Sequence, residues 1–144
     1  MKKTLVILGI SFIIIITILS IILINTKSSN SLLRKENGEY EYYIGRTIYG
    51  TDITTVINKA MNTNKKFEVP KDENGFYITD GKCSMKVYLE MIGREEVFAM
   101  EKIDALGSSQ FAELFNTSQF EAKEVKYHEN TGRIAEITFI QTEE

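Results

Sequence analysis

Several residue types that define common protein classes are scarce in this 144-residue sequence. It contains one cysteine, Cys83, one histidine, His128, one proline and no tryptophan. A single cysteine excludes an internal disulfide, and a single histidine excludes a histidine-rich metal site. No glycine-rich phosphate loop, serine nucleophile elbow or His-Glu metal helix occurs. The sequence therefore predicts a protein that is not an enzyme, with no catalytic, cofactor-binding or metal-binding residues and no cofactor.

Charge is absent from one long stretch near the start of the chain. Thr4–Ile24 contains 21 residues, most of them isoleucine or leucine, and none is charged. A helix of this length is roughly 31 Å long, about the thickness of the hydrocarbon core of a bilayer. In lipid the backbone has no other hydrogen-bonding partner, so helix is expected despite the weak helix propensity of isoleucine. We expect residues 1–25 to be a transmembrane signal anchor whose partner is the lipid bilayer.

A cleaved secretory signal peptide is the alternative interpretation of this stretch. Lys2 and Lys3 supply a basic start, but the apolar run exceeds the usual 7–15 residues or so, and no Ala-x-Ala site follows it. Since Cys83 is the only cysteine, a lipoprotein is excluded. Lys2 and Lys3 adjoin the span directly and favour a cytoplasmic N-terminus. Basic residues after the span nearly balance them: Lys27, Arg34 and Lys35.

The remaining chain is long enough for one small domain. We expect a juxtamembrane linker over residues 26–38 and an extracytoplasmic α+β domain over residues 39–144. Without Lys2 and Lys3, 15 of the 17 basic residues remain against 20 acidic residues, a net charge of −5. This acidic balance argues against a nucleic-acid partner. A disulfide-free domain outside the membrane is typical of Gram-positive bacteria.

One amphipathic helix is clear after the expected span. Gly50-Thr51-Asp52 opens it, and Thr51 or Asp52 can cap its N-terminus. The segment Asn62–Asn64 is expected to end it. Its apolar residues recur at helical spacing and form a single stripe for the core: Ile53, Val56, Ile57, Ala60 and Met61. A second helix is expected from Ser108 to about Asn116, with Phe111, Leu114 and Phe115 buried.

Alternating patterns predict an antiparallel β-sheet. Glu39–Tyr49 reads as a strand; a continuing helix is the alternative, disfavoured by Gly38 and Gly45. Asp80-Gly81 is a hairpin signal between two strands. The expected strands are 65–69, 76–79, 82–91, 97–102, 120–127 and 133–141, the last two joined by a loop at Asn130-Thr131-Gly132. Together with the two helices, this order predicts an α+β fold with helices on one face of the sheet.

Four groups of residues were weighed as sites and interpreted as structural. Cys83 lies on the apolar side of the 82–91 strand, where a thiol is a small hydrophobe. His128 is expected at the surface of a turn, and a Cys83–His128 pair stays open. The acidic turn fails the calcium-loop pattern and is expected to be solvated: Asp72, Glu73, Asn74 and Asp80. The tyrosines near the span are expected to pack against the first soluble helix rather than lie at the lipid headgroups: Tyr40, Tyr42, Tyr43 and Tyr49.

Three segments carry a resemblance to a known group of proteins. They are Tyr42-Tyr43-Ile44-Gly45 with Gly50-Thr51-Asp52, then Ile57-Asn58-Lys59-Ala60, then 127–134 (Tyr-His-Glu-Asn-Thr-Gly-Arg-Ile). With these, the chain resembles uncharacterised single-pass membrane proteins of clostridia-like, low-GC Gram-positive bacteria. The resemblance implies a membrane anchor and no activity. The overall order is also similar to pilins and pseudopilins, but the residue five after Gly9 is Ile14 where a prepilin has glutamate.

Two functions follow as hypotheses. The first is a membrane-anchored, extracytoplasmic, non-catalytic module of the cell envelope that binds a protein partner or assembles. The second is a pilin- or pseudopilin-like structural subunit, which the architecture alone supports. The partner protein and the process are not encoded in any motif.

Overall fold

The computed structural model describes the backbone of residues 2–143 and the side chains of residues 10–26 and 33–143. The chain forms two compact units, Met1–Glu36 and Asn37–Glu144. Each unit is considered by itself below.

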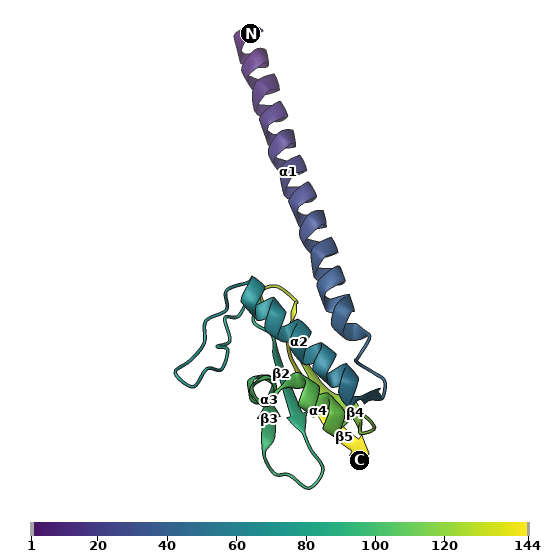
Figure 1. The fold of residues 1–144 in the computed structure, drawn as a ribbon. Helices are drawn as coiled ribbons and strands as arrows, with labels where there is room; N and C mark the ends of the chain where they lie inside the picture. The colour runs from purple at the N-terminus through teal and green to yellow at the C-terminus, as the bar shows by residue number, and fades with distance from the viewer. Residues whose placement is uncertain (1, 144) are drawn as a thin grey trace. The chain divides into compact units, whose positions relative to one another are not determined.

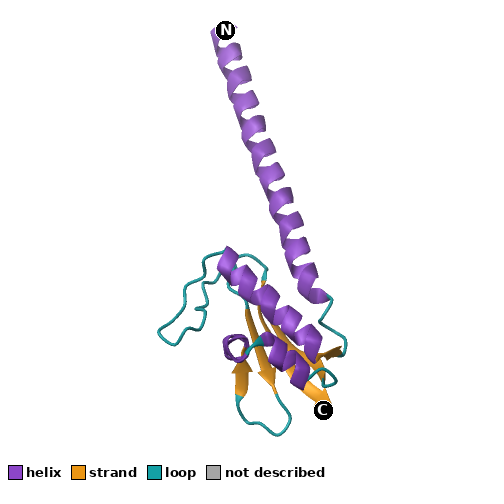
Figure 2. Cartoon of the chain, in the orientation of Figure 1, coloured by secondary structure: helices purple, strands orange, loops and turns teal. Residues whose placement is uncertain are grey.

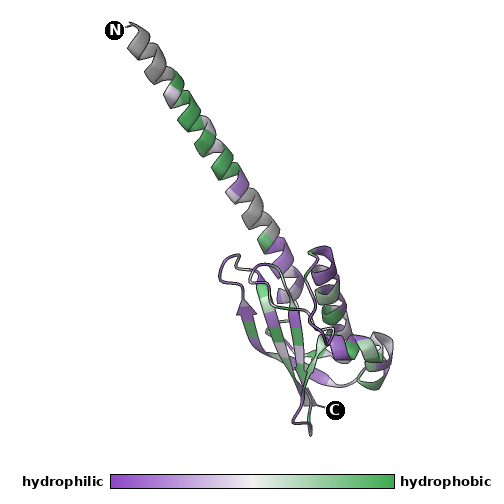
Figure 3. Cartoon of the chain, turned by 90° about the vertical axis from the view of Figure 1, so that its left-hand side faces the viewer, coloured by the Kyte–Doolittle hydropathy of each residue, from purple (hydrophilic) through white to green (hydrophobic). Residues whose placement is uncertain are grey.

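The first unit consists of helix. It belongs to α1 (Lys2–Glu41), which continues without a break through the predicted linker 26–38. Its described residues from Ile10 to Ile24 are mostly large, apolar and exposed (Figure 3). The hydroxyls of Thr17, Ser20 and Thr26 donate to backbone carbonyls three or four residues earlier, so these three polar groups are bonded within the helix.

A search of the described residues finds no helix that is both long and apolar enough to cross a membrane. Residues 4–9 of the predicted span Thr4–Ile24 lie outside the described side chains.

The second unit is an α+β fold, as predicted, but its sheet is mixed. The strands are β1 (Ile48–Tyr49), β2 (Lys86–Glu90), β3 (Val97–Ala99), β4 (Gln119–Tyr127) and β5 (Ile134–Glu143). Their order is β1-β4-β5-β2-β3, and the central β5–β2 pair is parallel. The prediction of a purely antiparallel sheet is therefore wrong. A parallel neighbour requires a long crossover, which hairpin signals along the sequence do not reveal.

Three helices cover one face of this sheet (Figures 1 and 3). They are α2 (Gly50–Lys66), α3 (Met100–Leu106) and α4 (Ser108–Leu114). The sheet side chains that face them include Val87, Leu89, Ile137 and Phe139, all 0% exposed. The core therefore lies between one helical layer and one sheet.

The helix α2 confirms the predicted stripe. All five apolar residues of the stripe are buried. At its N-terminus the Asp52 carboxylate accepts a hydrogen bond from the Tyr49 N–H at 3.1 Å. The helix continues to Lys66, past the predicted end at Asn62–Asn64, so the strand predicted over residues 65–69 is wrong. Asn64 is fully buried and stays in the helix because its side chain bonds Met85 in both directions at 2.7 Å.

The strand predicted from Glu39 is wrong as far as Glu41, where α1 ends and a turn begins. Tyr40 is buried, and its hydroxyl lies 3.2 Å from the Thr63 hydroxyl on α2. Gly38 is tolerated inside the helix, whereas Gly45 has φ +76° in the turn that follows. Only Ile48–Tyr49 of the predicted strand pairs, with β4.

The hairpin predicted at Asp80-Gly81 does not form. Residues 79–85 have no regular structure, and the whole stretch from α2 to β2 is drawn mostly as loop in Figure 2. The Asp80 carboxylate instead accepts bonds from the backbone N–H groups of Lys82, Cys83 and Ser84. This local network competes with strand pairing, and only Lys86–Glu90 of the predicted 82–91 strand remains extended in the sheet.

Later elements agree more closely with the prediction. The β4–β5 hairpin is confirmed, with Gly132 at φ +67° in its loop. Asn37 holds this loop: its amide donates to the Gly132 carbonyl at 3.0 Å, and its oxygen accepts from the Ile134 N–H at 3.1 Å. The predicted 97–102 strand ends at Ala99, because Met100 turns into the core as the first residue of α3. No local pattern in the sequence predicts α3.

Candidate binding cleft

A cleft of about 610 Å³ lies between the short helices and the end of the sheet. This volume is within the range of small-molecule and peptide sites, roughly 300–1,000 Å³. Its residues come from β2, the β2–β3 loop, β3, α3, α4, the α4–β4 turn and β5: Leu89, Met91, Ile92, Arg94, Phe98, Ile103, Leu106, Phe111, Leu114, Phe115, Thr117, Ser118 and Gln141.

The cleft has a buried apolar floor and an exposed apolar rim. Leu89, Ile103 and Phe111 form part of the floor and are at most 8% exposed. At the rim, Leu106 is 66% exposed and Leu114 is 68% exposed. The prediction that Leu114 is buried is therefore wrong, whereas Phe111 is buried as predicted. Leu106 and Leu114 lie at the C-terminal ends of α3 and α4, so both short helices present apolar surface at the same opening.

Four polar residues line the otherwise apolar cleft. Gln141 is already engaged: its oxygen accepts from the Ile92 N–H at 3.2 Å, and its amide donates to the Glu143 carbonyl at 3.3 Å. Ser118 is only 5% exposed, yet its hydroxyl has no hydrogen-bond partner within the described part of the chain. Thr117 and Arg94 likewise make no side-chain hydrogen bond or ion pair among the described residues, and both are exposed.

Sequence reasoning missed this cleft for a structural reason. Arg94, the adjacent Thr117 and Ser118, and Gln141 are separated from one another by more than 20 positions along the chain. They come together because β2 and β5 run parallel and end at the same edge. Periodicity correctly marked Phe111 as core, but it assigned Leu114 to the same buried face. The sequence pattern of a leucine at helical spacing is the same whether its side chain lies in a core or at the rim of a cleft.

Cys83 is half-buried in the loop before β2, not on a strand. Its thiol donates to the Asp80 carboxylate at 2.9 Å. Burial, together with this hydrogen bond and the Asp80 charge, raises the pKa of the thiol. A raised pKa reduces the thiolate fraction at neutral pH, which makes Cys83 a poor nucleophile. The predicted place of Cys83 on a strand is therefore wrong, and its structural role stays a prediction.

His128 is buried, so the prediction of a surface residue is wrong. It is 4% exposed, and its Nε2 donates to the Ser84 carbonyl at 2.7 Å. The sequence misled because a histidine beside a hairpin loop is usually exposed, whereas here the loop folds over the segment before β2. His128 and Cys83 thus lie near the same segment, but no hydrogen bond joins their side chains in the described structure. A second cavity, of about 320 Å³, adjoins His128.

In the acidic turn that begins at Asp72, the carboxylate forms hydrogen bonds with the backbone of the turn itself. The Asp72 carboxylate accepts bonds from the N–H groups of Asn74 and Phe76, each at 2.9 Å. Asp80 makes the corresponding bonds in its own loop. Among the described residues, no group of three or more acidic, cysteine or histidine side chains is arranged to hold a metal ion.

The tyrosines divide into two pairs. Tyr40 and Tyr43 are buried in the core beside α2, as predicted. Tyr42 and Tyr49 are exposed by 57% and 49%, so the packing prediction is wrong for them. The Arg46 guanidinium lies 4.1 Å from the centre of the Tyr42 ring, a distance at which a cation–π interaction stabilises this exposed aromatic.

The sheet face opposite the helices carries a different kind of surface. Ion pairs link its strands: Lys123 with Glu90 at 2.7 Å, and Lys126 with Glu136 at 2.6 Å. Such exposed pairs each contribute little, roughly 0–1 kcal/mol, to stability.

Fold and site together define the class: a small α+β unit with a five-stranded mixed sheet, a single helical layer and an apolar cleft at the sheet edge. Comparison with protein-family models, curated proteins and solved structures gave no match for this chain.

Proposed function

We propose that this protein is a membrane-anchored, extracytoplasmic and non-catalytic interaction or assembly module of the bacterial cell envelope. The observation that carries the proposal is the uncharged stretch Thr4–Ile24, whose length matches a bilayer. The residues after it supply a folded unit with its own core, from Asn37 onwards. In this proposal the stretch anchors the protein and the unit meets a protein partner outside the cytoplasm.

The cleft supports an interaction role for that unit. Leu106 and Leu114 expose large apolar side chains at an opening that is already lined by apolar residues. Exposed apolar patches of this kind mark surfaces that bind other molecules. The Cys83 thiol is hydrogen-bonded to Asp80 and its pKa is raised, which is consistent with a non-catalytic role for this residue.

Protease accessibility tests the proposed location. Protease added to intact cells, or to spheroplasts if a wall blocks access, is expected to remove the unit from Asn37 onwards and leave a short membrane-bound fragment. A cytoplasmic protein followed in the same sample controls for lysis. Protection of the unit until the membrane is permeabilised would contradict the proposal.

A pilin-like subunit is the alternative function. The observation that favours it is α1, a 40-residue helix that runs without interruption from the apolar stretch into the folded unit. The stretch lacks the glutamate five residues after Gly9, where Ile14 stands. Mass spectrometry of the mature protein distinguishes the two. A terminus at Ile10 would support the pilin-like subunit, whereas one at Met1 or Lys2 would support the anchor.

A further inference from the structure

We infer that the cleft binds the apolar C-terminal tail of a partner protein, with the tail's terminal carboxylate at Arg94. This inference rests on the proposed function as an interaction module and names the chemistry of its partner. The argument has three steps, which concern the open polar groups, the apolar walls and the charge.

The polar groups of the cleft are available to a ligand. Ser118 is 95% buried, lines the cleft and has a hydroxyl without a partner among the described residues. Since no fully buried polar side-chain atom lacks a partner in the described structure, the Ser118 hydroxyl opens onto the cleft, where a ligand atom can bond it. Thr117 offers a second open hydroxyl beside it, and Arg94 offers a planar set of donors.

The apolar walls require a ligand that is larger than the cavity. A small molecule enclosed in the cavity would leave the outer surfaces of Leu106 and Leu114 in water. A peptide that enters the cleft and crosses its rim covers both. The exposed leucines of the rim lie on α3 and α4, whereas Arg94, Thr117 and Ser118 lie in loops at the sheet edge. A chain that is apolar along its length and charged at its end matches this division.

The positive charge of Arg94 at the cleft indicates that the charged end of the ligand is negative. Arg94 is the only charged residue that lines the cleft, and it has no ion pair within the described structure. Its neighbour Glu96 forms an ion pair with Lys102, and the charge of Arg94 makes a smaller contribution to the lowered pKa of Glu96. A guanidinium binds a carboxylate through two parallel hydrogen bonds.

The test uses the full chain in phospholipid nanodiscs and two probe peptides of one sequence, acetyl-Gly-Leu-Phe-Leu-Leu. One peptide has a free C-terminal carboxylate and the other a C-terminal amide, and empty nanodiscs correct for binding to lipid. Affinity is measured by calorimetry. We expect the carboxylate form to bind at least tenfold more tightly than the amide.

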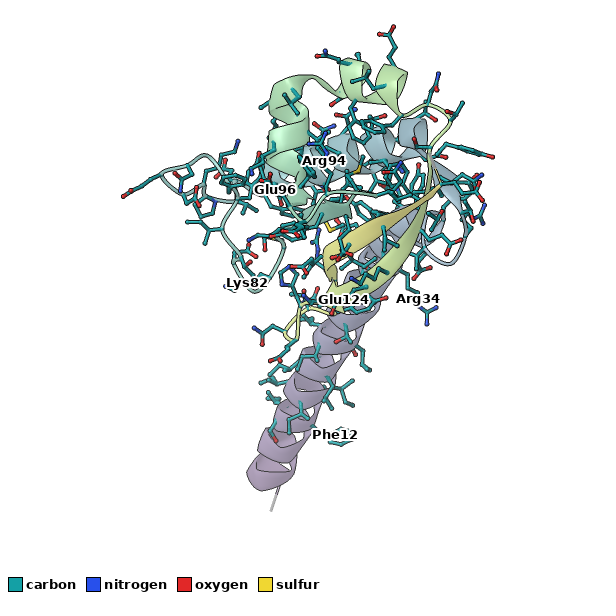
Figure 4. The ribbon with its side chains drawn as sticks, turned by 90° about the horizontal axis from the view of Figure 1, so that it is seen from below. Phe12, Arg34, Lys82, Arg94, Glu96 and Glu124 are labelled. Carbon is teal, nitrogen blue, oxygen red and sulfur yellow. The ribbon has the colours of Figure 1, made fainter. Side chains whose placement is uncertain are left out.

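Two charge-matched variants locate this preference. Arg94→Gln is expected to weaken binding of the carboxylate peptide about tenfold and to leave the amide peptide unchanged. Lys82→Gln also removes one positive charge, but it lies in the loop before β2, away from the cleft (Figure 4), and is expected to change neither peptide. Leu114→Ser is expected to weaken both peptides at least fivefold.

Three outcomes with the peptides overturn the inference. They are no binding, equal binding of the two peptides, and a carboxylate preference that survives Arg94→Gln. Dodecanoate forms a further arm: if it binds through Arg94 more tightly than the peptide, the cleft is an acyl-chain site and the inference fails. These failures leave the proposed function intact if protease still removes the unit from intact cells. Protection from protease would instead overturn the function, whatever the peptides do.

Discussion

At the scale of single residues, Asn64 is the buried polar group with the clearest structural role. It is 0% exposed and exchanges two hydrogen bonds of 2.7 Å with the backbone of Met85, which joins α2 to the segment before β2. Asn64→Ala leaves a buried N–H and a buried carbonyl without partners, so we expect a loss of about 2–4 kcal/mol in the free energy of unfolding. Urea unfolding of the full chain measures this loss.

Asn62→Ala is the matched control, because Asn62 lies two residues earlier on the same helix and is exposed. Alanine is the better helix former, so the control is expected to be neutral or slightly stabilising. Equal effects of the two substitutions would show that the bonds to Met85 contribute nothing beyond helix propensity.

Asp80 makes the stability depend on acid pH. Burial alone would raise its pKa, but hydrogen bonds from the Cys83 thiol and from the N–H groups of Ser84, Lys82 and Cys83 outweigh burial and hold the pKa well below 3.8. This pKa is lower in the folded state than in the unfolded state. The Asp80 carboxylate therefore contributes its full stabilisation at a pH above its unfolded-state pKa, and this stabilisation is lost as the pH falls toward the folded-state pKa.

We therefore expect Asp80→Asn to lower the melting temperature at pH 6, with a deficit that shrinks as the pH falls below about 4 toward 2. Melting curves of both proteins across this range measure the deficit. A deficit that stays constant with pH would show that the charge of Asp80 has no part in the stabilisation.

The Cys83 thiol gives a chemical readout of the same loop. Burial and the Asp80 carboxylate raise its pKa, so alkylation of the folded protein at pH 8 is expected to be at least about tenfold slower than in urea. Asp80→Asn is expected to accelerate alkylation, because the negative neighbour is gone. Rates are measured by mass spectrometry with iodoacetamide. Rapid labelling of the wild-type protein would restore Cys83 as a candidate nucleophile.

At the scale of elements, close packing fixes where α2 begins. Gly50 is buried, and a Cβ at this position would lie 2.1 Å from the Phe115 carbonyl oxygen. Gly50→Ala must displace the backbone after α4, so we expect a loss of about 2–3 kcal/mol, observed as a lower urea midpoint. Gly38→Ala has no atom within 4 Å of its new Cβ and is expected to be neutral or stabilising by up to about 1 kcal/mol. A neutral Gly50→Ala would contradict this packing.

The elements that could be predicted from the sequence are those with local causes. The stripe of α2 and the β4–β5 hairpin depend on spacing and on one loop with Gly132, and both are confirmed. The β2–β5 pairing joins residues about 50 positions apart, and α3 begins where Met100 is drawn into the core. Neither has a local signal. Asp80-Gly81 is a strong hairpin signal, but the Asp80 side chain accepts hydrogen bonds from backbone N–H groups that a hairpin would have paired with a neighbouring strand.

The candidate cleft was the least predictable feature for the same reason. Phe111 could be recognised as apolar and periodic, but nothing in the sequence brings Arg94 or Ser118 to the same opening. That requires the parallel pairing of β2 with β5, a property of the whole unit. Cys83 was expected on a strand but lies in a loop, where burial and its charged neighbour Asp80 disfavour the thiolate.

At the scale of the whole molecule, the proposed anchor depends on the unbroken lack of charge over Thr4–Ile24. Ile14 and Ile18 lie one helical turn apart near the middle of this stretch, and both are exposed. An arginine near the centre of a spanning helix costs about 2.5–3.5 kcal/mol on insertion, so the double substitution Ile14→Arg with Ile18→Arg is expected to prevent stable anchoring. The folded unit from Asn37 onwards has its own core and should be unaffected.

Alkaline carbonate extraction of membranes measures this effect. The wild-type protein and the control Ile14→Leu with Ile18→Leu are expected in the membrane pellet, since leucine is as apolar as isoleucine in such a helix. The double-arginine protein is expected in the supernatant with the urea midpoint of the folded unit unchanged. If it remains in the pellet, the stretch is not what holds the protein at the membrane. Retention would then have to come from the unit itself, and the exposed leucines of the cleft would be the first surface to test.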